Sequence, residues 1–193
     1  MINRVVLVTG LIEPRAAFWP LRHKIKRHDV PVEYFRDRIV FRNLEKSVRR
    51  LAELLSDDGG ASPIGVVTHS FGDWVARRAI AAAADHRVEA LVSIAPVMRA
   101  GFLPKMTRLV SGKLIPEIAT ITDPRRAAAD ADCDDRVRRL VVWGKFDECL
   151  KPVDLSAISN LESRSVPATH MSVVMQPDVL DMVDRFLFPP NPT

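Results

Sequence analysis

Long apolar runs are missing from this sequence of 193 residues. No stretch approaches the roughly 20 apolar residues that a membrane-spanning helix needs, so we expect no transmembrane segment. The apolar run 5–8 is too short for the hydrophobic core of a signal peptide, and it leads directly into Thr9-Gly10. We therefore expect a cytoplasmic protein.

Cysteine is scarce, since the chain contains only Cys133 and Cys149. Two cysteines cannot form the disulfide framework of a small secreted domain, although one disulfide between them stays open. Two free thiols in a reducing compartment are the default, which agrees with the missing signal peptide.

A large excess of charge of one sign is absent as well. The chain has 28 Lys and Arg against 24 Asp and Glu, a net charge of +4. The basic residues are scattered, and neither a recognition motif nor interleaved aromatic residues accompanies them. We therefore expect a solvated basic surface and no nucleic-acid partner. The sequence contains no signal for an oligomeric state.

Internal repeats and linkers are also missing, so we predict a single domain over residues 1–193 with an ample core. Apolar runs and helical patterns alternate along it. Strands are predicted at 4–8, 30–35, 64–67, 88–95, 139–143 and 165–168, and helices at 16–27, 44–55, 73–84 and from 177 onwards. This alternation predicts an α/β fold, a three-layer sandwich in which helices cover both faces of an open, mostly parallel sheet of about six strands.

Functional residues of such sheets lie beyond the carboxyl ends of the strands. The strand 64–67 is followed by Thr68-His69-Ser70-Phe71-Gly72 and then by a helix. A strand, a sharp turn with a central serine and a helix predict a nucleophile elbow, in which Ser70 is the nucleophile. The alternative is that Ser70 only caps the helix.

An aspartate and a histidine follow later strands. Asp147 comes after the strand 139–143, and His170 comes after the strand 165–168. In a parallel sheet these residues converge with Ser70 at one edge. A serine hydroxyl needs a base, and the base needs an orienting group. His170 would take the Ser70 proton, and Asp147 would hold the imidazole.

A developing oxyanion needs N–H donors that are already in place. The backbone N–H of Phe71, directly after the serine, is one candidate. The backbone N–H of Leu11, in the loop after the first strand, is the natural second. The helix N-terminus behind Ser70 also favours negative charge there.

Other residues compete for the acid and base roles. As the acid, Asp147 is favoured over its competitors because it follows Gly144 at a strand end; those competitors are Glu148, Asp154 and Asp123. As the base, His69 should point to the other side of the turn. Four other residues are expected to be exposed to solvent, namely His23, His28, His86 and Lys145. Cys149 is expected to be a small packed residue.

Together, the segments 5–11, 67–72, 142–147 and 169–188 resemble the α/β-hydrolase superfamily, and within it the small, nearly lidless lipases and esterases. The resemblance spans nearly the whole chain and implies a minimal version of the fold, which begins at the family's third strand. It implies Ser70 as nucleophile, Asp147 as acid, His170 as base, and Leu11 and Phe71 as backbone donors.

Three positions depart from the family pattern. Thr9 stands where a histidine is common, and Thr68 occupies the first glycine position of Gly-x-Ser-x-Gly. Asp73 stands where a glycine is common, and we expect its carboxylate to cap the following helix.

The apolar segment 96–119 would line an acyl pocket or form a small flap, through Met98, Phe102, Leu103 and Met106. The alternative is that these residues only cover the sheet. Residues 96–136 as a whole are a candidate cap or pocket-lining insertion.

We predict a serine hydrolase that cleaves carboxylic esters of small to medium apolar acyl groups through an acyl-enzyme, with no cofactor and no metal. A thioesterase or amidase would use the same residues, and a non-catalytic binding member of the fold is a further alternative. A nucleotide-binding Rossmann-like protein needs a glycine-rich turn after the first strand. This alternative is disfavoured, because Gly10 is the only glycine in the turn 8–13.

Overall fold

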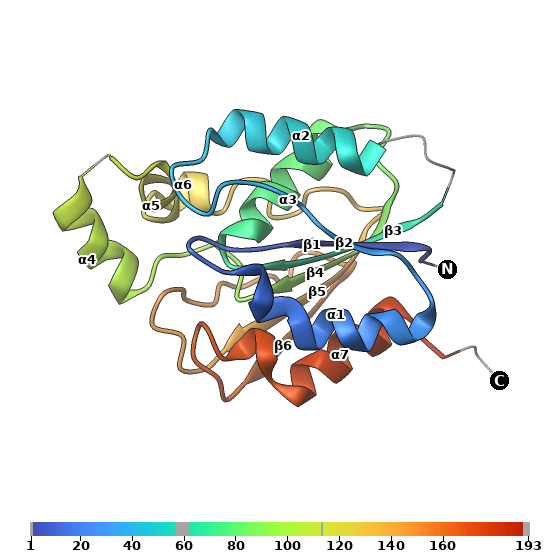
Figure 1. Cartoon of the computed structure of the whole chain (residues 1–193). Coiled ribbons are helices and arrows are strands. Elements are labelled where there is room, and N and C mark those ends of the chain that lie inside the picture. The colour runs from blue at the N-terminus through green and yellow to red at the C-terminus, as the bar shows by residue number, and fades with distance from the viewer. Residues whose placement is uncertain (1, 57–61, 113, 191–193) are drawn as a thin grey trace.

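The computed structural model describes residues 2–56, 62–112 and 114–190 (Figure 1). Its elements are, in chain order, β1 (Arg4–Val8), η1 (Arg15–Phe18), α1 (Trp19–Ile25), η2 (Lys26–His28), β2 (Val32–Tyr34), α2 (Leu44–Ser56), β3 (Ile64–His69), α3 (Phe71–Ala82), β4 (Val88–Ile94), α4 (Phe102–Ser111), α5 (Pro116–Ile121), α6 (Pro124–Ala127), β5 (Arg138–Gly144), β6 (Leu161–Val166), η3 (Val173–Met175) and α7 (Pro177–Leu187).

The six strands form one sheet in the order β2-β1-β3-β4-β5-β6, and every neighbouring pair runs parallel. All six residues of β3 are buried, because helices cover both faces of the sheet there. The predicted open parallel sheet of about six strands is confirmed. Its carboxyl ends all lie at one edge, so the loops that follow the strands meet there.

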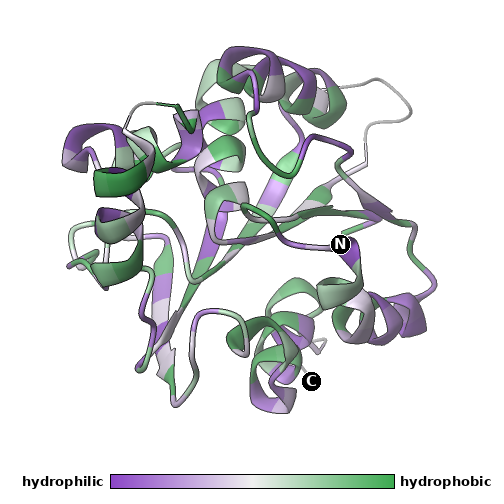
Figure 2. Cartoon of the chain, turned by 60° about the vertical axis from the view of Figure 1, so that its left-hand side comes forward, coloured by the Kyte–Doolittle hydropathy of each residue, from purple (hydrophilic) through white to green (hydrophobic). Residues whose placement is uncertain are grey.

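Helices α2 and α3 lie on one face of the sheet, and α1 and α7 lie on the other (Figure 1). Alternate residues of β1 serve the two cores: Val6 and Val8 pack with α2 and α3, whereas Val5 and Leu7 pack with α1 and α7. Hydrophobic and hydrophilic residues alternate along the helices in Figure 2, as expected of helices with one buried face.

Two predicted boundaries are wrong. The predicted helix 16–27 consists of the short helices η1, α1 and η2, and Pro20 lies in the first turn of α1. The last strand is Leu161–Val166 rather than 165–168, and four of its six side chains are exposed. The exposed residues are consecutive, so this edge strand is exposed on both faces there and lacks the apolar run by which buried strands are recognised.

A segment with three helices, α4 to α6, connects β4 to β5 (Figure 1). Arg77 of α3 is fully buried and donates hydrogen bonds to the carbonyl oxygens of Val97, Ala127 and Ala129. Its Nε donates to Asp73 Oδ2 at 2.8 Å. The prediction that Asp73 caps α3 is therefore wrong, because its carboxylate holds the arginine that ties this segment to α3.

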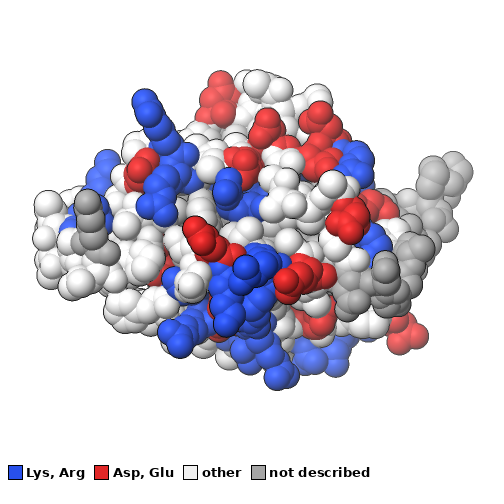
Figure 3. All heavy atoms as spheres, turned by 90° about the horizontal axis from the view of Figure 1, so that it is seen from above, with Lys and Arg blue, Asp and Glu red and all other residues white. Residues whose placement is uncertain are grey.

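Among the described residues, no helix is long and apolar enough to cross a membrane. On the face that carries α2, basic side chains lie among acidic ones (Figure 3). This arrangement agrees with the scattered charge of the sequence.

Candidate active site

Ser70 lies in the turn between β3 and α3 with φ 52° and ψ −122°. Positive φ is unfavourable for a residue with a Cβ, so the surrounding structure must enforce it. The Ser70 side chain makes no capping hydrogen bond to α3, which contradicts the alternative that it serves as a helix cap. Only 7% of its surface is exposed.

The turn brings the start of α3 against the end of β1. A Cβ on Gly72 would lie 2.3 Å from the Val8 carbonyl oxygen, and one on Gly10 would lie 2.9 Å from Ser70 Cβ. Both positions therefore exclude larger residues. This close approach brings the loop after β1 beside Ser70.

A continuous chain of hydrogen bonds begins at the serine hydroxyl. Ser70 Oγ lies 2.9 Å from His170 Nε2, and His170 Nδ1 lies 2.8 Å from Asp147 Oδ2. With Nδ1–H donating to the carboxylate, Nε2 is free to accept the hydroxyl proton. The structure therefore brings together the three side chains that the sequence places after β3, β5 and β6.

Asp147 is anchored by its other oxygen. Oδ1 accepts the backbone N–H groups of Cys149 at 2.8 Å and Leu150 at 2.7 Å. Burial by itself would raise the pKa of Asp147, but the hydrogen bond and charge of His170, together with the two N–H groups, outweigh it and hold the pKa below its ordinary value. The carboxylate is therefore ionised and fixed in orientation.

The competing acids contact other groups. Glu148 Oε2 accepts the backbone N–H of His170 at 3.3 Å rather than the ring. Asp123 caps α6, and Asp154 is exposed and accepts the N–H of Ser156. Among the described acidic residues, Asp147 is the one that bonds to the His170 imidazole.

The other predicted bystanders divide into exposed and buried residues. His23, His28 and Lys145 are exposed, as predicted. His86 is buried against Asp134 at 3.0 Å, so the prediction that it is solvated is wrong. Cys149 is half-buried, and burial with the charges of Asp147 and Glu148 raises its pKa to about 12.

Of the predicted backbone donors, Phe71 directly follows the serine, and Leu11 directly follows Gly10, where a Cβ would lie 2.9 Å from Ser70 Cβ. The N–H of Phe71 stands in the first turn of α3, where a helix has no acceptor for it. Among the hydrogen bonds of the described residues, neither Phe71 N–H nor Leu11 N–H has a partner. Arg42 supports the loop before Leu11, because its guanidinium donates to the Gly10 carbonyl oxygen at 2.6 Å and lies 5.6 Å from the Phe71 ring centroid.

The described residues contain one group with the ligand types of a metal site, namely Asp147, Cys149 and His170, whose ligand atoms lie within 4.8 Å of one another. Both carboxylate oxygens of Asp147 and both ring nitrogens of His170 already have hydrogen-bond partners. Asp147 and His170 of this group therefore already belong to the hydrogen-bond chain that begins at Ser70.

Solved structures share the architecture. The esterase Pf2001 of Pyrococcus furiosus matches with a TM-score of 0.69 at 16% identity, over 96% of this chain and 80% of its own. An α/β-hydrolase enzyme from the sediment metagenome of the Mar Chica lagoon, Morocco, matches with a TM-score of 0.67 at 14% identity, over 97% and 91%. The pyrethroid hydrolase PytH matches with a TM-score of 0.64 at 12% identity over the whole of both chains.

The chain has the α/β-hydrolase fold. The resemblance inferred from the sequence is thereby confirmed at the level of the fold. The sequence matches no protein-family model and no curated protein.

Within this α/β-hydrolase fold, the unusual Thr68 is fully buried, and its Oγ1 donates to the Val92 carbonyl oxygen of β4 at 3.1 Å. The side chain thus packs against the neighbouring strand, where a β-branched residue fits. The turn itself is left unobstructed.

The prediction for His69 is wrong. Its ring does not point away but lies 4.9 Å from the His170 ring, and Nε2 donates to the His170 carbonyl oxygen at 2.9 Å. Glu13, whose role was not predicted, contacts the same imidazole. The one sequence signal for Glu13 is a carboxylate three residues after Gly10, in a loop at the functional edge.

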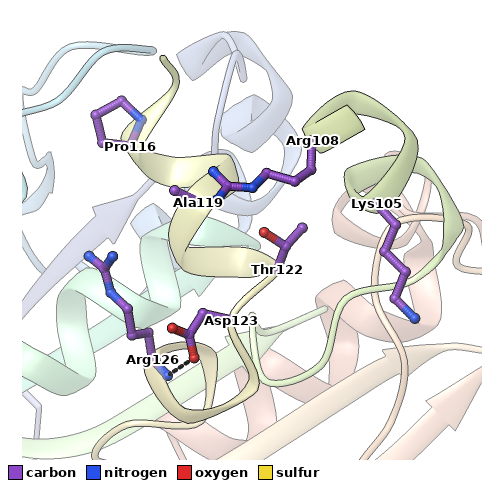
Figure 4. A pocket seen from close by; sticks show the side chains of 7 residues that line it. All are labelled: Lys105, Arg108, Pro116, Ala119, Thr122, Asp123 and Arg126. Atoms are coloured by element: carbon purple, nitrogen blue, oxygen red, sulfur yellow. Dashed lines mark hydrogen bonds between the residues drawn. The ribbon is translucent and has the colours of Figure 1, made fainter. Parts of the chain in front are cut away.

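The four predicted pocket residues separate in space. Met98 is buried in a small core with Val141, Trp143 and Leu155, so it does not line an open pocket. Phe102, Leu103 and Met106 are exposed on α4. A hollow of about 820 Å³ lies instead between α4 and the pair α5 and α6 (Figure 4), and its lining residues are Lys105, Arg108, Pro116, Ala119, Thr122, Asp123 and Arg126.

Proposed function

We propose that this chain is a serine hydrolase that cleaves carboxylic esters through an acyl-enzyme. One observation carries the proposal: the unbroken hydrogen-bond chain from Ser70 Oγ through the His170 imidazole to Asp147. A hydroxyl in this setting is activated as a nucleophile, and the strained turn presents it at the functional edge of the sheet.

In the first half-reaction, Ser70 Oγ attacks the ester carbonyl carbon while its proton passes to His170 Nε2. Asp147 stabilises the imidazolium that forms, and the N–H groups of Phe71 and Leu11 stabilise the oxyanion. His170 then donates its proton to the departing alkoxide, which leaves as the alcohol. Water repeats the sequence on the acyl-enzyme and releases the acid, with Ser70 regaining its proton.

The substrate is proposed to carry a small to medium apolar acyl group. Exposed apolar side chains follow the carboxyl ends of several strands: Ile12 after β1, Phe41 after β2, Phe146 after β5 and Met171 after β6. These loops meet at the edge where Ser70 lies, so an apolar rim surrounds the site. Helix α4 adds Phe102, Leu103 and Met106, and we take residues 96–136 as a small cap on the single domain 1–193.

The test is hydrolysis of p-nitrophenyl esters of increasing chain length, with wild type beside Ser70→Ala. We expect turnover that the substitution abolishes while the fold is retained, and the chain-length optimum measures the pocket. Labelling with a fluorophosphonate provides a second readout that does not depend on the substrate. Absence of both turnover and labelling at Ser70 in wild type would refute the proposal and leave a binding member of the fold.

A further inference from the structure

A second carboxylate and imidazole lie buried beside the first. Glu13 is 1% exposed and His69 is fully buried. Glu13 Oε1 lies 2.9 Å from His69 Nδ1, an ion-pair distance, and neither atom makes a hydrogen bond to any other described residue. Burying a carboxylate is costly unless it is compensated, so such a pair needs a reason to persist.

Both ends of this pair contact the backbone of the proposed active site. Glu13 Oε2 accepts the N–H of Gly10 at 2.5 Å, immediately before the proposed donor Leu11. At the other end, His69 Nε2 donates to the carbonyl oxygen of His170 itself at 2.9 Å. Gly10, Glu13, His69 and His170 therefore form one connected path.

The path joins two loops that β1 and β6 place at the same sheet edge but that belong to distant parts of the sequence. One loop carries a proposed oxyanion donor and the other carries the proposed base, and His69 also directly precedes Ser70. A small change in their separation would misplace the donors relative to the attacking oxygen. Rate losses of about 100-fold accompany misplacements of about 1 Å at reacting groups.

We infer that Glu13 and His69 are positioning residues that fix the Gly10–Leu11 loop and the His170 loop relative to each other. This role rests on the proposed function of the site. Neither residue touches the substrate, so the pair acts on the transition state through the geometry of the base and the oxyanion donors.

Two substitutions at His69 separate this role from simple packing. In His69→Gln, the amide N–H can still reach the His170 carbonyl oxygen, whereas the shorter side chain of His69→Asn cannot. We expect His69→Asn to lower kcat for a p-nitrophenyl ester by about 10- to 100-fold with little change in KM, since ground-state binding is untouched. His69→Gln should retain most of the wild-type kcat.

Glu13→Leu changes the other end of the path and removes both contacts of the carboxylate, with the Gly10 N–H and with His69 Nδ1. Its kcat should fall by a similar factor, and the double variant Glu13→Leu/His69→Asn should be little worse than either single variant, because both break the same path. If Glu13→Leu does not fold, the comparison of His69→Gln with His69→Asn still decides the question.

A matched control is the pair of buried His86, before β4, and half-buried Asp134, before β5; the two side chains are 3.0 Å apart at the opposite end of the sheet. Asp134→Asn should keep wild-type kcat, whatever it does to the melting temperature. Equal kcat in His69→Asn and wild type, or equal losses in His69→Asn and His69→Gln, would overturn the positioning role. Labelling of Ser70 in wild type with a fluorophosphonate is measured first. Failure of this labelling refutes the proposed function, whereas the kcat values of the His69 variants test the positioning role.

Discussion

Gly72 lies against the end of β1, where a Cβ on it would stand 2.3 Å from the Val8 carbonyl oxygen. Because the obstacle is backbone, Gly72→Ala must displace either the turn or strand β1. We expect it to lower the free energy of unfolding by at least about 3 kcal/mol. Urea denaturation followed by circular dichroism measures this loss.

Gly112 offers the matched control for this substitution. It adopts φ +58°, but a Cβ there would meet nothing within 4 Å. Gly112→Ala should therefore cost about 1–3 kcal/mol, from the strained backbone conformation alone. Equal losses at the two glycines would contradict a steric requirement at Gly72.

Thr68 contributes to stability despite its departure from the family pattern. Thr68→Val removes the hydrogen bond to Val92 and should cost about 1 kcal/mol. Thr68→Gly restores the common motif but leaves a cavity and a freer chain, so we expect a loss of about 2–3 kcal/mol. Thermal unfolding of the two variants beside wild type checks the order, and a Thr68→Gly variant more stable than wild type would contradict it.

Much of the fold could be predicted because its signals are local. The buried strands β1, β3, β4 and β5 are continuous apolar runs, and each is found close to its predicted position. β6 is an edge strand whose residues 162–165 are all exposed, so its sequence is polar and lacks the apolar run of a buried strand. The sequence does not separate the helices α4 to α6, since in the segment 96–119 apolar residues mark both buried and exposed positions.

The positions of Ser70, Asp147 and His170 could be anticipated because each follows a strand of one parallel sheet. The partners of His69 and His86 could not, because Glu13 and Asp134 lie in distant parts of the chain. Asp73 differs from them, because its partner Arg77 lies one turn later in the same helix, at the i,i+4 spacing of a local ion pair. A one-residue pattern carries no information about which distant residue completes a buried pair.

The hydrogen bonds of Asp147 predict a specific effect of Asp147→Asn. An asparagine amide has only one acceptor oxygen. It cannot accept both the His170 Nδ1–H and the two backbone N–H groups, so its NH₂ group must face one of these donors. It therefore favours the wrong tautomer of His170, and we expect kcat to fall by about 10³- to 10⁴-fold. Ester hydrolysis measures the loss.

Asp154 supplies the control for that variant, because it is exposed and bonds to the N–H of Ser156. Asp154→Asn should retain the wild-type rate. A wild-type rate in Asp147→Asn would remove Asp147 from the proposed mechanism.

Burial and the charges of Asp147 and Glu148 raise the pKa of Cys149 to about 12, from an ordinary value of about 9. The folded state therefore retains a proton that the unfolded state releases, so this stabilising contribution is complete below pH 9 and is lost as the pH rises toward about 12. Cys149→Ser lacks this titration, and the stability of wild type relative to it should fall between pH 9 and pH 12.

Alkylation by iodoacetamide at pH 8.5 should correspondingly be slow at Cys149 in the folded protein and rapid in urea, because the thiolate is the reactive species. Peptide mass spectrometry in a Cys133→Ala background isolates that site, and rapid modification of the folded protein would contradict the raised pKa.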